Sequence, residues 1–185
     1  MGGERKIRLL ACSDWCDSGF GRVMRELLPR LARTGRFEVE MVGWTYEGEA
    51  DVYDEAKSLG VRLHPAYGPW GAKSVERLIA TWKPDVLFTL GDPWMVDWAG
   101  KIAGRDRVRW VMYTPIDRDP ISRAWIDVLS RPDCLVLYSD WGAEVVRRQM
   151  PYRTPLVIPH GVDTTVFHPF TPEKRRAARR MLGID

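Results

Sequence analysis

The first segment whose residue types could do chemistry is the loop 13–22, which carries two glycines and an arginine. Gly19 and Gly21 stand where an apolar run gives way to a helical pattern, and Arg22 follows them. Glycines at such a junction let the backbone approach a ligand, and the free amides that begin a helix attract phosphate. The loop therefore predicts a phosphate-binding helix start, with Arg22 as a fixed positive charge. The alternative is that both glycines only permit a tight turn.

The same loop does not match the fingerprint of a dinucleotide-binding protein. A G-x-G-x-x-G motif would need a third glycine at position 24, where Met24 stands. It would also need an acidic residue at the end of the second strand, where the chain reads Trp44-Thr45-Tyr46. We therefore expect no nicotinamide cofactor. The sequence also has no G-x-S-x-G, H-E-x-x-H or Walker motif.

Carboxylates follow two further apolar runs. Asp92 and Asp119 each precede a proline, which predicts a helix N-cap at both positions. Asp117 has no such role, and it is therefore the candidate for acid–base catalysis or hydroxyl binding. The alternative for Asp117 is a solvated carboxylate paired with Arg118. Trp94 lies next to Asp92 and belongs either to the core or to an acceptor cleft.

The last two candidate loops lie nearer the C-terminus. Ser139 precedes a helical pattern and is a candidate for its cap and for the cleft. The turn-forming stretch 158–169 contains His160, Gly161, Asp163 and His168. Two histidines could ligate a metal by type, but no third ligand accompanies them at a useful spacing. We therefore expect no metal site.

A regular alternation of elements predicts how these loops are positioned. Seven apolar runs bounded by turn residues read as buried parallel strands, at 7–12, 39–44, 61–64, 86–90, 108–113, 134–138 and 156–158. Helical patterns lie between or after them, at 20–31, 51–59, 74–82, 140–149 and 172–182, with further helices expected after Asp92 and Asp119. This order predicts a doubly wound, Rossmann-like α/β parallel sheet of about seven strands. Ligands of such sheets bind at the carboxyl ends of the strands, where these loops lie.

Composition excludes several classes of protein. The 185 residues carry a net charge of +3, and the segment 173–185 alone holds five Lys or Arg against two acidic residues. A basic excess confined to one short helix does not predict nucleic-acid binding. Three cysteines without zinc or redox spacing indicate a reducing, cytoplasmic environment. The Arg-lined amphipathic helix from Arg22 to Arg33 leaves peripheral membrane contact open as an alternative to an ordinary surface helix.

The order of the motifs resembles the N-terminal half of a retaining GT-B glycosyltransferase, most of all one of glycosyltransferase family 4 (group 1). The resemblance rests on the glycine loop, on Lys83-Pro84-Asp85-Val86 at the start of a strand, on the segment 133–142, and on Pro159-His160-Gly161-Val162-Asp163 with Phe167-His168-Pro169. It implies a hexosyltransferase-like enzyme that moves a sugar from a nucleotide-sugar donor to an acceptor hydroxyl. It implies no metal or other cofactor.

The resemblance also implies roles for particular residues. Gly19, Gly21 and Arg22 would bind the donor diphosphate, and Asp117 would replace the histidine of the His-Asp pair that many relatives carry. The cleft and acceptor site would be lined by Asp92, Trp94, Ser139, His160, Gly161 and Asp163. Residues 1–170 would form the N-terminal, acceptor-side domain. Residues 171–185 would form a basic interdomain helix leading to a C-terminal donor domain.

Because the donor-binding groups of the family belong to that second domain, we expect the chain to be inactive alone. Three alternatives stay open: a stand-alone binding or assembly domain, half of a two-chain enzyme, and a GT-B-related nucleotide-sugar epimerase. An unpaired cleft face would be an exposed patch that could also form a homodimer.

Overall fold

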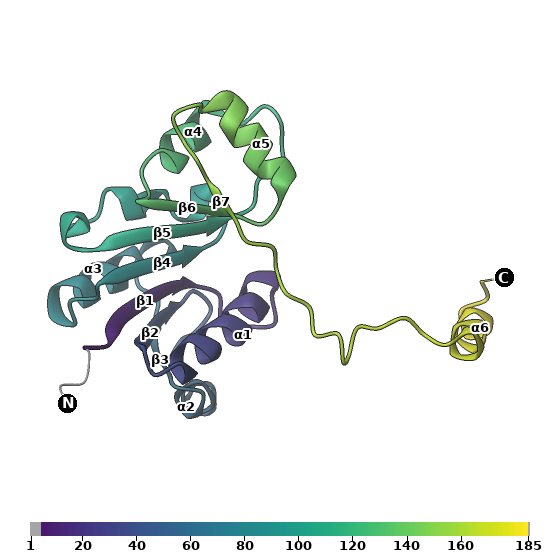
Figure 1. The fold of residues 1–185 in the computed structure, drawn as a ribbon. Coiled ribbons are helices and arrows are strands. Elements are labelled where there is room, and N and C mark those ends of the chain that lie inside the picture. The colour runs from purple at the N-terminus through teal and green to yellow at the C-terminus, as the bar shows by residue number, and fades with distance from the viewer. Residues whose placement is uncertain (1–4, 185) are drawn as a thin grey trace.

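The computed structural model describes residues 5–184, which form a seven-stranded parallel sheet with helices on both faces (Figure 1). The strands are β1 (Ile7–Ser13), β2 (Phe37–Gly43), β3 (Val61–Pro65), β4 (Val86–Leu90), β5 (Arg109–Thr114), β6 (Cys134–Leu137) and β7 (Leu156–Val157). Their order is β3-β2-β1-β4-β5-β6-β7, so the direction of winding reverses between β1 and β4. This confirms the predicted doubly wound α/β fold.

Within residues 5–184, six α-helices connect or follow the strands: α1 (Gly19–Arg33), α2 (Ala50–Ser58), α3 (Ala72–Thr81), α4 (Arg123–Leu129), α5 (Asp140–Gln149) and α6 (Pro172–Met181). Short 3₁₀ helices add η1 (Pro69–Gly71), η2 (Pro93–Met95), η3 (Asp97–Gly100) and η4 (Arg105–Arg107). Residues of α1 and α2 pack in one apolar cluster, and residues of α3, α4 and α5 pack in the other. The sheet therefore separates two hydrophobic layers.

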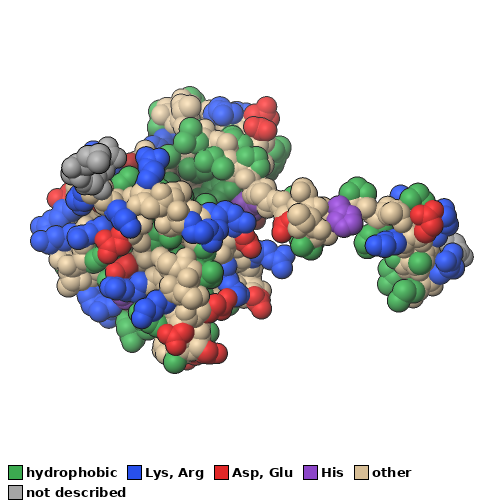
Figure 2. Space-filling view, turned by 60° about the horizontal axis from the view of Figure 1, so that its bottom comes forward, with side chains coloured by type: hydrophobic (Ala, Val, Ile, Leu, Met, Phe, Trp, Pro, Cys, Tyr) green, Lys and Arg blue, Asp and Glu red, His purple; other side chains and the backbone are tan. Residues whose placement is uncertain are grey.

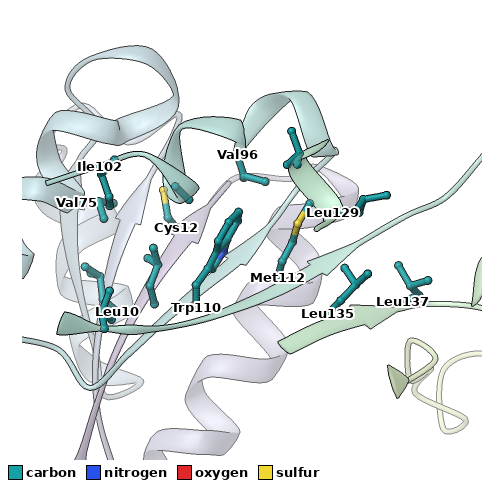
Figure 3. Packing of buried hydrophobic residues seen from close by; sticks show 14 of the residues in the cluster. Leu10, Cys12, Val75, Val96, Ile102, Trp110, Met112, Leu129, Leu135 and Leu137 are labelled. Atoms are coloured by element: carbon teal, nitrogen blue, oxygen red, sulfur yellow. The ribbon is translucent and has the colours of Figure 1, made fainter. Parts of the chain in front are cut away.

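Trp110 is the largest fully buried side chain among the described residues and anchors the layer formed by α3, α4 and α5. Figure 3 shows its ring among Cys12, Val96 and Met112. Its indole N–H donates to Thr89 Oγ1 at 2.9 Å, which satisfies the one polar atom of the ring inside the core. The hydrogen bond crosses from β5 to β4, so it ties together the strands that precede Asp117 and Asp92.

One predicted helix cap is wrong, and the other is confirmed only in its position, since Asp92 is the N-cap residue of η2 and Pro93 follows it. Asp92 is followed only by the single turn η2, and within residues 5–184 its side chain makes no cap hydrogen bond. Asp119 precedes a cis peptide bond to Pro120, and its carboxylate pairs with Arg148 on α5. Helix α4 instead begins after Ser122, whose hydroxyl accepts from the amide of Trp125. The local Asp-Pro pattern was outweighed at position 119 by a partner on another helix.

The chain after β7 leaves the body of the protein. Residues 158–171 form an exposed arm that carries α6 away from the sheet (Figure 1), and Figure 2 shows the arm and helix standing clear of the remaining surface. Helix α6 buries none of its residues. The helix predicted at 172–182 is confirmed, whereas the domain boundary at residue 170 stays a prediction. Over residues 5–184 no helix combines the length and the apolar character that a membrane crossing requires.

Candidate functional site

The loop between β1 and α1 is built around the hydroxyl of Ser18, which caps the helix. Ser18 Oγ accepts from the amide of Gly21 at 2.9 Å and donates to Asp14 Oδ2 at 2.8 Å. A Cβ on Gly21 would lie 2.0 Å from the carbonyl oxygen of Cys16, so only glycine lets the loop pass this close to the helix. This packing supports the alternative interpretation of Gly21, in which the turn requires a glycine.

Gly19 has no such constraint, because no described atom lies within 4 Å of the position that its Cβ would take. Its amide is the first of α1, a position at which the helix itself supplies no acceptor. A ligand oxygen can therefore approach the backbone at Gly19 without displacing a side chain. The structure separates the two glycines: Gly21 is explained by packing, and Gly19 is not.

Arg22 lies on the outer side of α1 and lines a hollow of about 390 Å³ between α1 and α2. Arg25 crosses the same hollow and pairs with Asp17 at 3.0 Å and with Glu55 at 2.7 Å. Three carboxylates and four arginines line the hollow, so its charge is nearly balanced. The role of Arg22 at a donor diphosphate stays a prediction.

Asp92 and Asp117 form an electrostatically coupled pair at the carboxyl edge of the sheet. They follow β4 and β5, which are neighbours with Leu90 opposite Tyr113. Burial raises the pKa of Asp92, and the negative charge of Asp117 raises it further. Asp92 is half-buried and Asp117 is exposed. Two carboxyl groups therefore lie at neighbouring strand ends, and the exposed one is free to accept a hydrogen bond.

Aromatic rings continue the site toward β7. The hydroxyl of Tyr113 donates to the carbonyl oxygen of Ile158 at 2.6 Å, which fastens the start of the arm to β5. The ring of Tyr138 lies 4.6 Å from that of Tyr113 and 4.1 Å from that of His160. Burial lowers the pKa of His160, so its imidazole is neutral at pH 7. His160 therefore faces the strand ends as a neutral hydrogen-bonding ring.

Tyr138 is a candidate that the sequence did not single out. Its hydroxyl is buried and has no hydrogen-bond partner among the described residues. Burial, together with the neighbouring Tyr113 and Asp92, raises its pKa, so the hydroxyl keeps its proton and remains a donor. The only sequence signal was its place as the last residue of an apolar run. A buried hydroxyl without a partner is a position where a bound polar atom would be stabilised.

The remaining predicted residues differ in their structural roles. Ser139 Oγ accepts from the amide of Gly142 at 3.2 Å and thereby caps α5. Asp163 accepts from the amide and hydroxyl of Thr165 at 2.8 and 2.6 Å, which closes a turn within the arm. Gly161 has open space at its Cβ position as far as the described residues go. Ser139 and Asp163 therefore have local structural roles, whereas Gly161 has none.

Trp94 lies at the other end of the site in a row of tryptophans. Its ring centroid is 5.2 Å from that of Trp70, which in turn is 5.1 Å from that of Trp44. Trp94 is exposed in the short turn η2, so it is not part of the core. Trp44 and Trp70 were not among the predicted site residues.

The loops that carry Gly19, Asp117 and Gly161 all leave the same edge of one sheet. They follow β1, β5 and β7, whose carboxyl ends meet at that edge because every strand pairing is parallel. The acidic pair lies beside the reversal between β1 and β4, where doubly wound sheets bind their ligands. The predicted convergence of these loops agrees with the topology.

Comparison with known proteins shows which proteins share this sequence pattern and fold. Residues 18–166 match Glycosyltransferase Family 4. The fold is similar to a crystal structure of TcCGT1 in complex with UDP, with a TM-score of 0.58, 12% sequence identity and coverage of 95% of this chain. The chain spans 55% of the length of that structure. No curated protein sequence matches the chain significantly. The matched region covers most of the sheet and its loops, and the chain belongs to Glycosyltransferase Family 4.

Proposed function

We propose that the chain is the acceptor-side domain of a retaining hexosyltransferase that uses a nucleoside-diphosphate sugar as donor. The observation that carries the proposal is the coupled pair of Asp92 and Asp117 at the strand ends beside the reversal of the sheet. The UDP in the similar structure supports a nucleoside diphosphate as the leaving group. The mechanism needs positioning and electrostatic stabilisation, and it uses no metal ion.

In this proposal the acidic pair serves the acceptor. Asp117 is exposed and can accept a hydrogen bond that orients the acceptor hydroxyl. The hydroxyl oxygen then bonds to the anomeric carbon on the face from which the diphosphate departs, and the departing diphosphate oxygen takes the hydroxyl proton, so that the configuration is retained. Asp92, whose pKa is raised by burial and by the charge of Asp117, supplies a second hydrogen-bonding carboxyl group at the neighbouring strand end. The two carboxyl groups thereby orient the acceptor hydroxyl.

The donor side is supplied in part by α1 and in part by a companion lobe. The open backbone at Gly19 leaves room for a diphosphate oxygen at the helix N-terminus. His160 and Gly161 begin the arm that leads away from the strand ends toward α6. An exposed arm and a helix without buried residues are what an interdomain connection would present before its second lobe packs against it. The chain alone is therefore inactive in this proposal.

The test uses the chain joined to a second Rossmann-like lobe, either in one polypeptide or as a second chain. Asp117→Asn should lower kcat about 100-fold or more, because a positioned acid–base group contributes that much. Asp106→Asn is the matched control, since Asp106 is an exposed carboxylate in η4 at the opposite edge of the sheet. Full turnover by Asp117→Asn would refute the role of the pair.

The same assay separates the alternatives. Proton NMR of the product reports whether the anomeric configuration of the donor is retained. An epimerase would release a changed nucleotide sugar in the absence of any acceptor, whereas a transferase releases the nucleoside diphosphate only as the acceptor is consumed. Turnover by residues 1–185 alone would refute the requirement for a companion lobe. Activity on mixing two separate lobes would identify half of a two-chain enzyme, and analytical ultracentrifugation would report a stand-alone domain or a homodimer.

A further inference from the structure

Three tryptophans form a continuous row along the carboxyl edge of the sheet. Trp44 follows β2, Trp70 lies in η1 after β3, and Trp94 lies in η2 after β4. Each contact is edge to face, with interplanar angles of 70° between Trp44 and Trp70 and 80° between Trp70 and Trp94. Trp70 is 37% exposed and Trp94 is 49% exposed. The row therefore presents aromatic surface to solvent at the edge where ligands of this fold bind.

The row is fixed in place by specific backbone and side-chain contacts. The indole N–H of Trp44 donates to the carbonyl oxygen of Trp70 at 3.0 Å and lies 3.2 Å from Cys12 Sγ. A Cβ on Gly91 would lie 2.5 Å from the Trp44 ring, so the strand end leaves room for that ring. Trp70 has φ of 47° and ψ of 35°, a left-handed conformation that is strained for a bulky residue. The fold holds these rings rigid without burying them.

The row ends beside hydrogen-bonding groups. Asp92 lies two residues before Trp94 in the loop that follows β4, and Trp94 opposes the rise in the pKa of Asp92. The charge of Asp117 acts on Asp92 in turn, and the charge of Asp92 acts on Tyr138, whose buried hydroxyl has no partner among residues 5–184. Aromatic faces and hydrogen-bonding carboxyl groups are therefore continuous along this edge.

A pyranose ring has the matching chemistry. Its C–H faces are apolar and can stack on exposed aromatic rings, while its hydroxyl groups donate to carboxylate oxygens. An anionic lipid surface would be repelled by the two carboxyl groups, and a purely aromatic ligand would leave them without donors. We propose that the Trp44–Trp70–Trp94 row is the platform for a carbohydrate acceptor, with Asp92 binding its hydroxyl groups. This inference rests on the proposed function, because it names the acceptor class of that site.

The test measures sugar binding by the purified chain, since the whole row lies within it. Methyl glycosides of glucose, galactose and mannose, and the disaccharides maltose, lactose and cellobiose, are titrated while the indole N–H resonances are followed by NMR. At least one sugar should shift the resonances of Trp70 and Trp94 saturably. Trp94→Ala should lower its association constant about tenfold, which is the loss expected when one stacking ring is removed. Trp94→Tyr should keep part of the affinity, because it retains an aromatic face.

Tyr152→Ala is the matched control, because Tyr152 is an exposed aromatic residue, 69% exposed, in the turn before β7 at the other edge of the sheet. It should bind the same sugar with unchanged affinity. Circular dichroism checks that each variant is folded. If Trp94→Ala is not folded, the affinity of the conservative Trp94→Tyr variant is compared with that of the wild type instead. Absence of saturable binding by every sugar up to its solubility limit would overturn the inference. Binding that Trp94→Ala and Tyr152→Ala weaken equally would also overturn it.

Two further probes identify the other acceptor classes. Saturable binding of phenol without binding of any sugar, or partition of the chain onto phosphatidylcholine vesicles through Trp94, would overturn the carbohydrate assignment. Failure of the inference is distinguishable from failure of the proposed function. Transfer to a non-carbohydrate acceptor by the two-lobe protein would leave the function intact and refute the inference. Sugar binding by the row, with no transfer from any nucleotide sugar, would refute the function and leave the inference intact.

Discussion

Replacing Gly21 by alanine tests whether the loop between β1 and α1 is shaped by packing. The added Cβ would lie 2.0 Å from the carbonyl oxygen of Cys16 and 2.9 Å from its amide nitrogen, whereas ordinary contacts begin near 3.4 Å. Both atoms belong to backbone, so relief requires the loop or the helix to move by more than an ångström. Overpacking of this kind costs about 3 kcal/mol. Alanine recovers about 1 kcal/mol through its higher helix propensity.

The net expectation for Gly21→Ala is a loss of about 2 kcal/mol in the free energy of unfolding. For a chain of this size that corresponds to a fall in Tm of roughly 4–8 °C. Urea unfolding followed by circular dichroism, with a thermal scan, measures both quantities. The lost hydrogen bond between the Gly21 amide and Ser18 Oγ would add to the effect if the loop moves.

Gly19→Ala is the matched control in the same turn of helix. No described atom lies within 4 Å of its Cβ position, so alanine should leave the stability unchanged or raise it by about 0.5 kcal/mol. In the two-lobe enzyme the same methyl group should raise the KM for the nucleotide sugar, because it occupies the space through which a diphosphate would approach. A Gly21→Ala variant as stable as the wild type, or an equal loss in Gly19→Ala, would refute the packing argument.

Three other side chains give expectations of the same kind. The amide of Arg8 donates to Asp85 and lowers the pKa of that carboxyl group, so the ionised carboxylate stabilises the fold. Asp85→Asn should therefore destabilise the fold at about pH 7, and the difference from the wild type should disappear below about pH 3, as the midpoints of urea unfolding across that range will show. Trp110→Phe should cost about 2–3 kcal/mol in urea unfolding, because it leaves a cavity and an unpaired Thr89 hydroxyl. Tyr113→Phe should cost about 1 kcal/mol and speed amide hydrogen exchange in residues 158–163.

The sequence predicted the seven strands to within two residues because a parallel sheet buries both faces of its strands. Runs such as Leu9-Leu10-Ala11-Cys12 have no polar alternation, and they are fully explained by one physical requirement. The convergence of the loops followed from the same requirement, since parallel strands place all their carboxyl ends at one edge. Those parts of the site that depend on the backbone alone were therefore predictable.

Side-chain contacts between distant loops were not predictable in this way. In the row of tryptophans, Trp44 and Trp70 are 26 positions apart in the sequence, and Trp70 and Trp94 are 24 positions apart. Nothing in the local sequence around Trp44 or Trp70 distinguishes an exposed ring from a core ring. The cap predicted at Asp119 failed for the same reason, because its partner Arg148 lies on another helix. Periodicity describes which face of an element is buried, and it carries no information about which loops touch.

The structure also divides the predicted site residues by a criterion that the sequence could not supply. Gly21 is a glycine because Cys16 occupies the place of its Cβ, and Ser139 is a serine because α5 needs a cap. The fold alone is sufficient to explain both residues, so they need no ligand. Gly19 and Asp117 satisfy no packing, capping or pairing requirement among the described residues. A residue type that the fold does not require is best explained by what binds there, so variants at these two positions should change transfer or ligand binding more than stability.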